Sequence, residues 1–102
     1  MVAIVEDKRE AIAALCRRYG VVRLFVFGSA LRDDFRPGKS DVDLLVEFGP
    51  MSGHEKAHAY FDLLDEMTEL LGTRVDLVMA GAVKNRYIAR DIEATKRELY
   101  AA

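Results

Sequence analysis

Two aspartates, Asp41 and Asp43, stand one residue apart at the start of a predicted strand, DVDLLVEF, over residues 41–48. Alternate side chains of a strand leave the same face, so both carboxylates point to one side, about 6.5–7 Å apart along the chain. Unpaired carboxylates placed side by side raise each other's pKa and oppose folding. Mg²⁺ removes this conflict, because it prefers hard oxygen ligands such as one or two carboxylates together with substrate phosphates. The spacing therefore predicts a magnesium site.

A third carboxylate, Asp76, interrupts the predicted strand RVDLVM at residues 74–79. A strand ordinarily carries an apolar or neutral side chain at such a central position. If this strand pairs beside residues 41–48, Asp76 joins Asp41 and Asp43 on one face. Three converging carboxylates are typical of a two-metal site, whose ions stabilise the attacking and leaving oxygens of an in-line displacement.

Gly28 and Ser29 end the apolar strand VVRLFVF at residues 21–27. Glycine permits a positive φ and lets the backbone approach a ligand closely. A helix that begins just after it offers free N–H groups and a positive dipole end to an anion, and the Ser29 hydroxyl can add a hydrogen bond to a phosphate oxygen. One strand end would then hold phosphates and the next would hold metal, which is the arrangement of nucleotidyl transfer.

Each of these features also has an ordinary explanation. Gly-Ser is a common turn dipeptide, Asp-x-Asp on a strand is often a solvated polar face, and Asp76 could balance Arg74 at a sheet edge. The order of the features along the chain, rather than any one of them, indicates metal and phosphate chemistry.

The elements that must position these residues follow from hydrophobic spacing. The first helix carries Ile12, Leu15, Cys16 and Tyr19 on one face, so Cys16 is a predicted core residue. The pattern predicts helices over 5–19, about 54–71 and about 83–100, strands over 21–27, 41–48 and 74–79, and a short helix at 30–35. We expect one α/β (α+β) domain over residues 1–102, with a short mixed or antiparallel sheet and helices mainly on one face.

Local signals mark several boundaries. Ser52 with Glu55, and Asp7 with Glu10, resemble capping boxes that open helices. Gly72 is a natural helix stop. In the second helix the aromatic residues Tyr60 and Phe61 are expected to pack in the core.

Composition narrows the class of protein. The 102 residues include 15 basic and 17 acidic ones, a formal net charge of −2. Direct nucleic-acid binding is not expected, because such domains usually carry a basic excess. One cysteine excludes an internal disulfide framework and fits a reducing compartment. With no leader and no long apolar span in view, we expect a soluble, cytoplasmic protein without membrane contact.

The stretch FVFGSALR, continued by KSDVDLLVEF, resembles the signature of the minimal nucleotidyltransferases, the antitoxin-type branch of the DNA polymerase β superfamily. The resemblance covers almost the whole chain and implies the nucleotidyltransferase fold. It implies three catalytic and metal-binding carboxylates: Asp41, Asp43 and Asp76. It implies a nucleotide-binding set of four residues: Gly28, Ser29, Arg32 and Ser40. The chain departs from the family pattern at Asp33-Asp34, where glycine usually follows the arginine.

The resemblance also implies an activity. Members of this branch use ATP and two Mg²⁺ ions to transfer AMP to a hydroxyl, typically a tyrosine of a HEPN-type toxin encoded nearby, as the antitoxin of a type VII pair. Two alternatives stay open, namely an antitoxin that neutralises its partner by binding alone and a nucleotidyltransferase for small molecules. A chain of 102 residues leaves little room for the extra domain that small-molecule enzymes usually carry.

Two further groups of residues deserve notice. His54 and His58 have a spacing that could bind Zn²⁺, but no cysteine or third histidine accompanies them, so we expect them to be solvent-exposed. Tyr87, Arg90 and Lys96 on the last predicted helix are candidates for contact with a partner.

Overall fold

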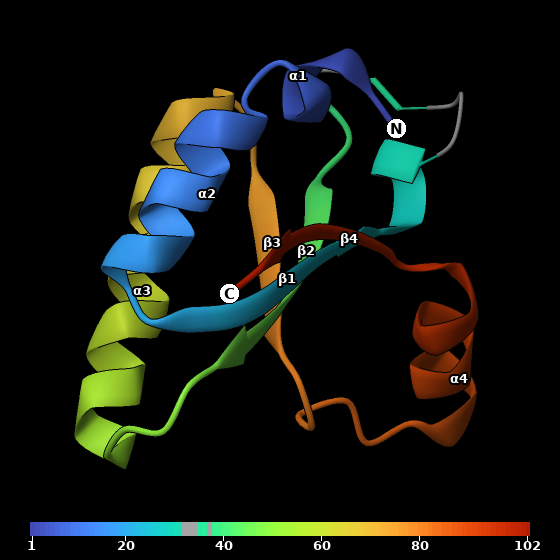
Figure 1. The fold of residues 1–102 in the computed structure, drawn as a ribbon. Coiled ribbons are helices and arrows are strands. Elements are labelled where there is room, and N and C mark those ends of the chain that lie inside the picture. Colours follow the sequence, from blue (N-terminus) through green and yellow to red (C-terminus); the bar gives the residue numbers. More distant parts are fainter. Residues whose placement is uncertain (32–34, 37) are drawn as a thin grey trace.

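The computed structural model describes residues 1–31, 35–36 and 38–102. Its elements, in chain order, are α1 (Ala3–Glu6), α2 (Arg9–Arg18), β1 (Val21–Phe27), the 3₁₀ helix η1 (Gly28–Leu31), β2 (Val42–Phe48), α3 (Gly53–Leu71), β3 (Val75–Met79), α4 (Arg86–Thr95) and β4 (Arg97–Ala101). Figure 1 shows them as a ribbon coloured along the chain.

The four strands form one mixed sheet in the order β3-β2-β1-β4. β1 is antiparallel to both of its neighbours, whereas β2 and β3 are parallel. A parallel pair needs a long crossover, and α3 supplies it between β2 and β3. The predicted mixed sheet flanked by helices is confirmed.

The main core lies between the sheet and the pair α2 and α3 (Figure 1). Alternation along β2 sends Val42, Leu44 and Val46 to this face, where all three side chains are fully buried. α2 contributes Ile12 and Cys16, and α3 contributes residues such as Met67. Cys16 is therefore a core residue, as its helical spacing predicted.

The opposite face of the sheet is covered by α4 alone (Figure 1). Ile92 of α4 packs there against Phe25 and Leu45 in a second, smaller apolar cluster. The helices thus lie mainly on one face, as expected: α1, α2 and α3 pack on the main core, and α4 lies on the other face.

The tail also departs from the predicted single helix over 83–100. Helix α4 ends at Thr95, Lys96 turns extended with ψ 149°, and the chain continues as β4. β4 takes the free edge of β1. The backbone hydrogen bonds of that edge outweigh the helical spacing of the tail, because an unpaired strand edge leaves its polar groups without partners.

Two local signals were read correctly. The Ser52 hydroxyl accepts a hydrogen bond from the Glu55 N–H at 3.1 Å, which opens α3. Gly72 ends α3 with a φ of 65°, in the left-handed region that favours glycine.

Three expectations were wrong or incomplete. The predicted first helix is two helices, and Asp7 does not cap the second, because Lys8 stands at that position without a side-chain bond. Phe61 points outward and is 62% exposed, whereas Tyr60 packs at the edge of the core. The short helix expected at 30–35 is a 3₁₀ turn over Gly28–Leu31; residues 32–34 lie outside the described residues.

None of the helices in the described part of the chain combines the length and the apolarity needed to cross a membrane.

Candidate functional site

The strand register brings two of the predicted carboxylates to adjacent positions. Asp43 of β2 pairs laterally with Phe27 of β1 on one side and with Asp76 of β3 on the other. Laterally paired residues point to the same face of a sheet, so the two carboxylates share the face that carries Leu45 and Val78, which is the α4 face. Asp43 is partly buried and Asp76 is exposed to solvent.

Asp41 lies just before β2, one row further along. Its neighbour on the next strand is Arg74, whose Nε lies 2.9 Å from Asp41 Oδ1. Arg74 also donates from Nη2 to the Lys39 carbonyl at 3.0 Å, and its own carbonyl accepts from the Val42 N–H at 2.9 Å. Arg74 therefore ties down the segment that carries Asp41. The sequence analysis considered Asp76 as the partner of Arg74, whereas the structure pairs Arg74 with Asp41, because the register of a parallel pair cannot be read from local spacing.

Gly28 brings the backbone directly against the Asp43 carboxylate. Its φ is 72°, and a Cβ placed on it would lie 2.2 Å from Asp43 Oδ2. No other residue type can stand here without displacing Asp43. The predicted need for glycine at this strand end thus has a specific cause.

Ser29 and Ser40 hold the loop around Asp41. The Ser29 hydroxyl donates to the Asp41 carbonyl at 3.2 Å, which links η1 to the start of β2. The Ser40 hydroxyl accepts from the Arg36 N–H at 3.0 Å, and the Ser40 carbonyl accepts from Thr73 Oγ1 at 3.4 Å. Arg32, the fourth predicted nucleotide-binding residue, lies outside the described residues.

Carboxylate oxygens are the type of ligand that Mg²⁺ prefers. Two observations concern how many of them are available to a metal ion here. Asp41 Oδ1 is shielded from solvent and accepts no hydrogen bond, but the Arg74 guanidinium lies 2.9 Å from it as a charge contact. A metal ion at Asp41 would therefore have to bind beside Arg74 or displace it. Across the described residues, moreover, no group of three or more histidine, cysteine, aspartate or glutamate side chains is gathered closely enough to hold a metal ion.

A cavity of about 340 Å³ opens beside Gly28. Phe27, Gly28 and Leu31 form one wall, and α4 forms the other with residues that include Ile88 and Asp91. A ligand that reached the Gly28 backbone would therefore also touch α4.

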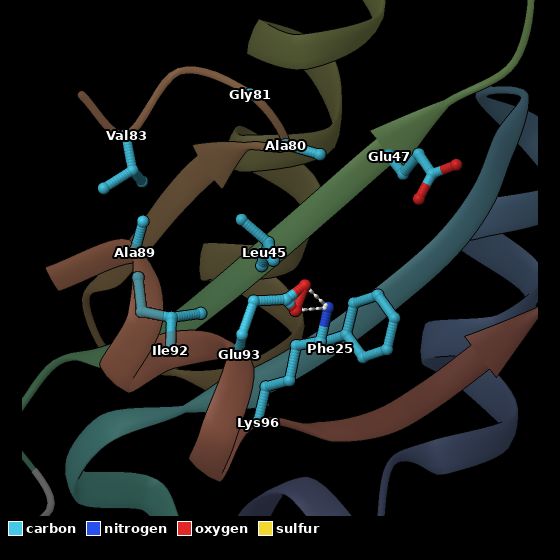
Figure 2. Close-up of a pocket in the computed structure, with 10 residues that line it drawn as sticks. All are labelled: Phe25, Leu45, Glu47, Ala80, Gly81, Val83, Ala89, Ile92, Glu93 and Lys96. Atoms are coloured by element: carbon cyan, nitrogen blue, oxygen red, sulfur yellow. Dashed lines mark hydrogen bonds and ion pairs between the residues drawn. The ribbon is translucent and has the colours of Figure 1, made fainter. Parts of the chain in front are cut away.

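A second cavity of about 230 Å³ lies further along the same face, between α4 and the sheet (Figure 2). Phe25, Leu45 and Ile92 line it, together with Lys96. The Lys96 ammonium lies 4.0 Å from the centre of the Phe25 ring and 2.7 Å from a Glu93 oxygen. Lys96 is thus engaged within the chain, which disfavours its predicted role in partner contact.

The two histidines stay apart from this site. His54 and His58 are exposed on α3 with ring centres 4.6 Å apart, on the face of the sheet opposite to Asp43. Their exposure agrees with the expectation from sequence.

The mixed sheet, with Gly28 against the Asp43 carboxylate and Asp76 on the next strand, has the order of features that the nucleotidyltransferase signature predicted. The chain belongs to the nucleotidyltransferase domain family, whose sequence profile matches residues 8–99.

Two curated relatives share much of the chain. "Putative protein adenylyltransferase MJ0128" of Methanocaldococcus jannaschii is 43% identical over 79 residues, which cover 78% of this chain and 76% of the relative. "Protein adenylyltransferase MntA" of Thermococcus cleftensis is 39% identical over 71 residues, covering 70% of this chain and 68% of the relative.

Solved structures agree in fold. A structure described as a "putative minimal nucleotidyltransferase" has a TM-score of 0.66 at 34% identity, covering 90% of this chain and 89% of that one. The MNT antitoxin complexed with a tri-AMPylated HEPN toxin of Shewanella oneidensis gives 0.66 at 18% identity, with 96% and 73% covered. A toxin–antitoxin structure with AMP-PNP gives 0.70 at 18% identity, with 92% and 73% covered. The resemblance to minimal nucleotidyltransferases is confirmed.

Proposed function

We propose that this chain is a Mg²⁺-dependent protein adenylyltransferase, which moves AMP from ATP to a tyrosine hydroxyl of a HEPN-type toxin and thereby acts as the antitoxin of a type VII pair. The observation that carries the proposal is the placement of Gly28 against the Asp43 carboxylate, with Asp41 one row away. The names of the curated relatives support the protein acceptor. The AMPylated toxin and the AMP-PNP of the solved relatives support the partner and the nucleotide.

Each residue of the candidate site would have its own role in the transfer. Asp41 and Asp43 would hold Mg²⁺ together with phosphate oxygens of ATP, and Asp76, which pairs laterally with Asp43 but is not gathered with both around one point, would add a carboxylate from the next strand. When bound, Mg²⁺ neutralises phosphate charge and lowers the pKa of a hydroxyl placed beside it. Gly28 would allow the phosphates to approach the backbone, and Ser29 would keep the Asp41 segment in place through its hydrogen bond. Asp76, the exposed carboxylate, would accept the proton of the attacking hydroxyl.

The reaction balances without a further reactant. The tyrosine oxygen forms a bond to the α-phosphorus of ATP, and the bond from that phosphorus to the bridging oxygen breaks. Pyrophosphate leaves with the electron pair, and the tyrosine proton passes to Asp76 and then to water. The products are AMP-tyrosine and pyrophosphate.

The test is a mass measurement on the partner. The toxin is incubated with ATP, Mg²⁺ and either the wild-type chain or the double variant Asp41→Asn with Asp43→Asn. Wild type is expected to add adenylyl groups, whereas the double variant should add none, and circular dichroism verifies that the double variant is folded. Asp65→Asn is the control, because Asp65 is exposed on α3 on the opposite face and should leave labelling unchanged.

Two results would contradict the proposal. Labelling by the double variant would show that other residues carry the reaction. Neutralisation of the toxin by wild type without any gain in mass would favour the antitoxin that acts by binding alone.

A further inference from the structure

The first half of α4 exposes two large apolar side chains. Tyr87 is 79% exposed and Ile88 is 54% exposed, and they are neighbours in the first turn of the helix. Among the described residues the only other large apolar side chain exposed to this degree is Phe61, on α3. Adjacent exposed apolar residues are typical of an interaction site rather than of ordinary surface.

Basic residues flank this apolar pair along the chain, and Asp91 lies one turn further on α4. Residues 84–90 contain three basic residues, Lys84, Arg86 and Arg90, and no acidic one. All three are exposed, and none forms an ion pair with another described residue. In a chain with a net charge of −2, this segment is a local basic surface. A partner that covers it gains from negative charge.

The segment is also continuous with the candidate site. Ile88 lines the same cavity as Gly28, and Gly28 touches the Asp43 carboxylate position. A chain lying across Tyr87 and Ile88 can therefore direct a side chain into the space beside Gly28.

We propose that residues 84–90 form the docking surface for the acceptor, an acidic protein segment with apolar side chains that presents its tyrosine to the site beside Gly28. The transfer of AMP to that tyrosine rests on the proposed function, whereas binding of the acidic segment to residues 84–90 does not depend on it. Apolar side chains of the segment contact Tyr87 and Ile88, and its carboxylates pair with Arg86 and Arg90.

A protein fits this surface better than a nucleic acid. A phosphate backbone could pair with the basic residues, but the exposed apolar side chains of Tyr87 and Ile88 would gain nothing from it. A second copy of the chain fits less well, because the same basic residues would face each other across a two-fold axis.

The experiment measures binding first and transfer second. The probes are a fluorescent peptide with one tyrosine among glutamates and leucines, the matching peptide with lysines in place of the glutamates, and single-stranded RNA. The variants are Tyr87→Ser with Ile88→Ser, and Arg86→Glu with Arg90→Glu. Their controls are Phe61→Ser, an equally exposed apolar residue on α3, and Arg17→Glu, an exposed arginine on α2. Circular dichroism verifies that every variant is folded.

Each double variant is expected to weaken binding of the acidic peptide about tenfold, because residues at the centre of an interface carry most of its binding energy. The controls should weaken binding less than about twofold. Raised salt should weaken binding to wild type but not to the arginine variants. Tighter binding of RNA or of the lysine peptide than of the acidic peptide would overturn the proposal. So would a dimer of the free chain that Tyr87→Ser with Ile88→Ser dissolves in sedimentation.

The transfer step separates the two proposals. With ATP and Mg²⁺ added, wild type should label the acidic peptide, and Arg86→Glu with Arg90→Glu, which lie outside the cavity beside Gly28, should raise the KM for the peptide while the affinity for ATP stays unchanged. Binding without labelling of either peptide or toxin would refute the adenylyl transfer and leave the docking surface standing. Labelling that the docking variants do not change would refute the docking surface alone.

Discussion

The two faces of the sheet differ in how completely their side chains are buried. On the face covered by α2 and α3, alternate residues of β1 and β2 are apolar and fully shielded from solvent. On the face covered by α4, apolar residues share the strands with Asp43 and Glu47. The second face has a cluster of only three buried residues, Phe25, Leu45 and Ile92.

The difference follows from the helices. The long helix α3 has 19 residues and, together with α2, closes its face of the sheet. Helix α4 has 10 residues and buries only Ile92 against its face, where Asp43 is partly buried and Asp76 is exposed. A carboxylate under α3 would lose its solvent, whereas under a short helix it remains available to a ligand. The four predictions that follow test this division.

The largest effect is expected from neighbouring residues that face opposite ways. Leu44 is fully buried on the α3 face, and Leu45 is buried in the small cluster on the α4 face. Leu44→Ala should lower the free energy of unfolding by about 2–5 kcal/mol, because it leaves a cavity in the larger core. Leu45→Ala should cost less, because its site lies next to an open cavity and can relax. Urea unfolding of both variants measures the difference; an equal loss would contradict the division.

The second prediction concerns the contact between Gly28 and Asp43. Gly28→Ala should cost about 1–3 kcal/mol for the left-handed backbone and should also displace the Asp43 carboxylate, which abolishes transfer. Gly72→Ala is the matched control, since Gly72 has a φ of 65° and nothing within 4 Å of its added Cβ. In urea unfolding, Gly72→Ala should lose the backbone part alone, and Gly28→Ala should lose at least as much because its Cβ also collides with Asp43. Only the Gly28 variant should lose activity, and retained activity would contradict the proposed site.

The third prediction uses pH to probe the closed face. Burial raises the pKa of the Cys16 thiol from 9.0 to about 12. The folded chain then keeps a proton that the unfolded chain releases, so this stabilisation is complete below pH 9 and is lost as the pH rises towards 12. The loss is at most about 1.4 kcal/mol for each pH unit.

Cys16→Ala supplies the control for that measurement. The stability difference between wild type and the variant should be constant below pH 9 and should shrink above it. Tyr19, whose pKa is raised by its hydrogen bond to Glu66, contributes equally to both proteins and cancels. A difference that does not change from pH 8 to pH 11 would show that the thiol is accessible to solvent.

The smallest effect on stability is expected on the open face. The Arg74 and Asp41 side chains are 71% and 45% exposed, so their ion pair is screened by solvent. Arg74→Gln should therefore change the free energy of unfolding by less than about 1 kcal/mol, and less still at high salt. The same variant should alter the binding of Mn²⁺, followed by electron paramagnetic resonance, because Arg74 holds the Asp41 segment. A large loss of stability would place Arg74 in the core of the fold.

Much of the site was legible in the sequence because its rules are local. The period of two along residues 41–48 separates Asp43 from the buried valines and leucine of the same strand, and the strand of residues 21–27 ends where Gly28 was expected to break it. The Ser52 cap and the Gly72 stop depend only on near neighbours, and both formed as predicted.

The tertiary structure decided what depends on residues far apart in the chain. The register between β2 and β3 places Arg74 beside Asp41, and it sets Asp76 beside Asp43 without gathering three acids around one point. The free edge of β1 made a strand of residues 97–101, and the turn that precedes it put α4 over the face that carries Asp43. Spacing along a chain fixes which way a side chain points, whereas strand pairing chooses its neighbours, and pairing is settled only when the whole sheet closes.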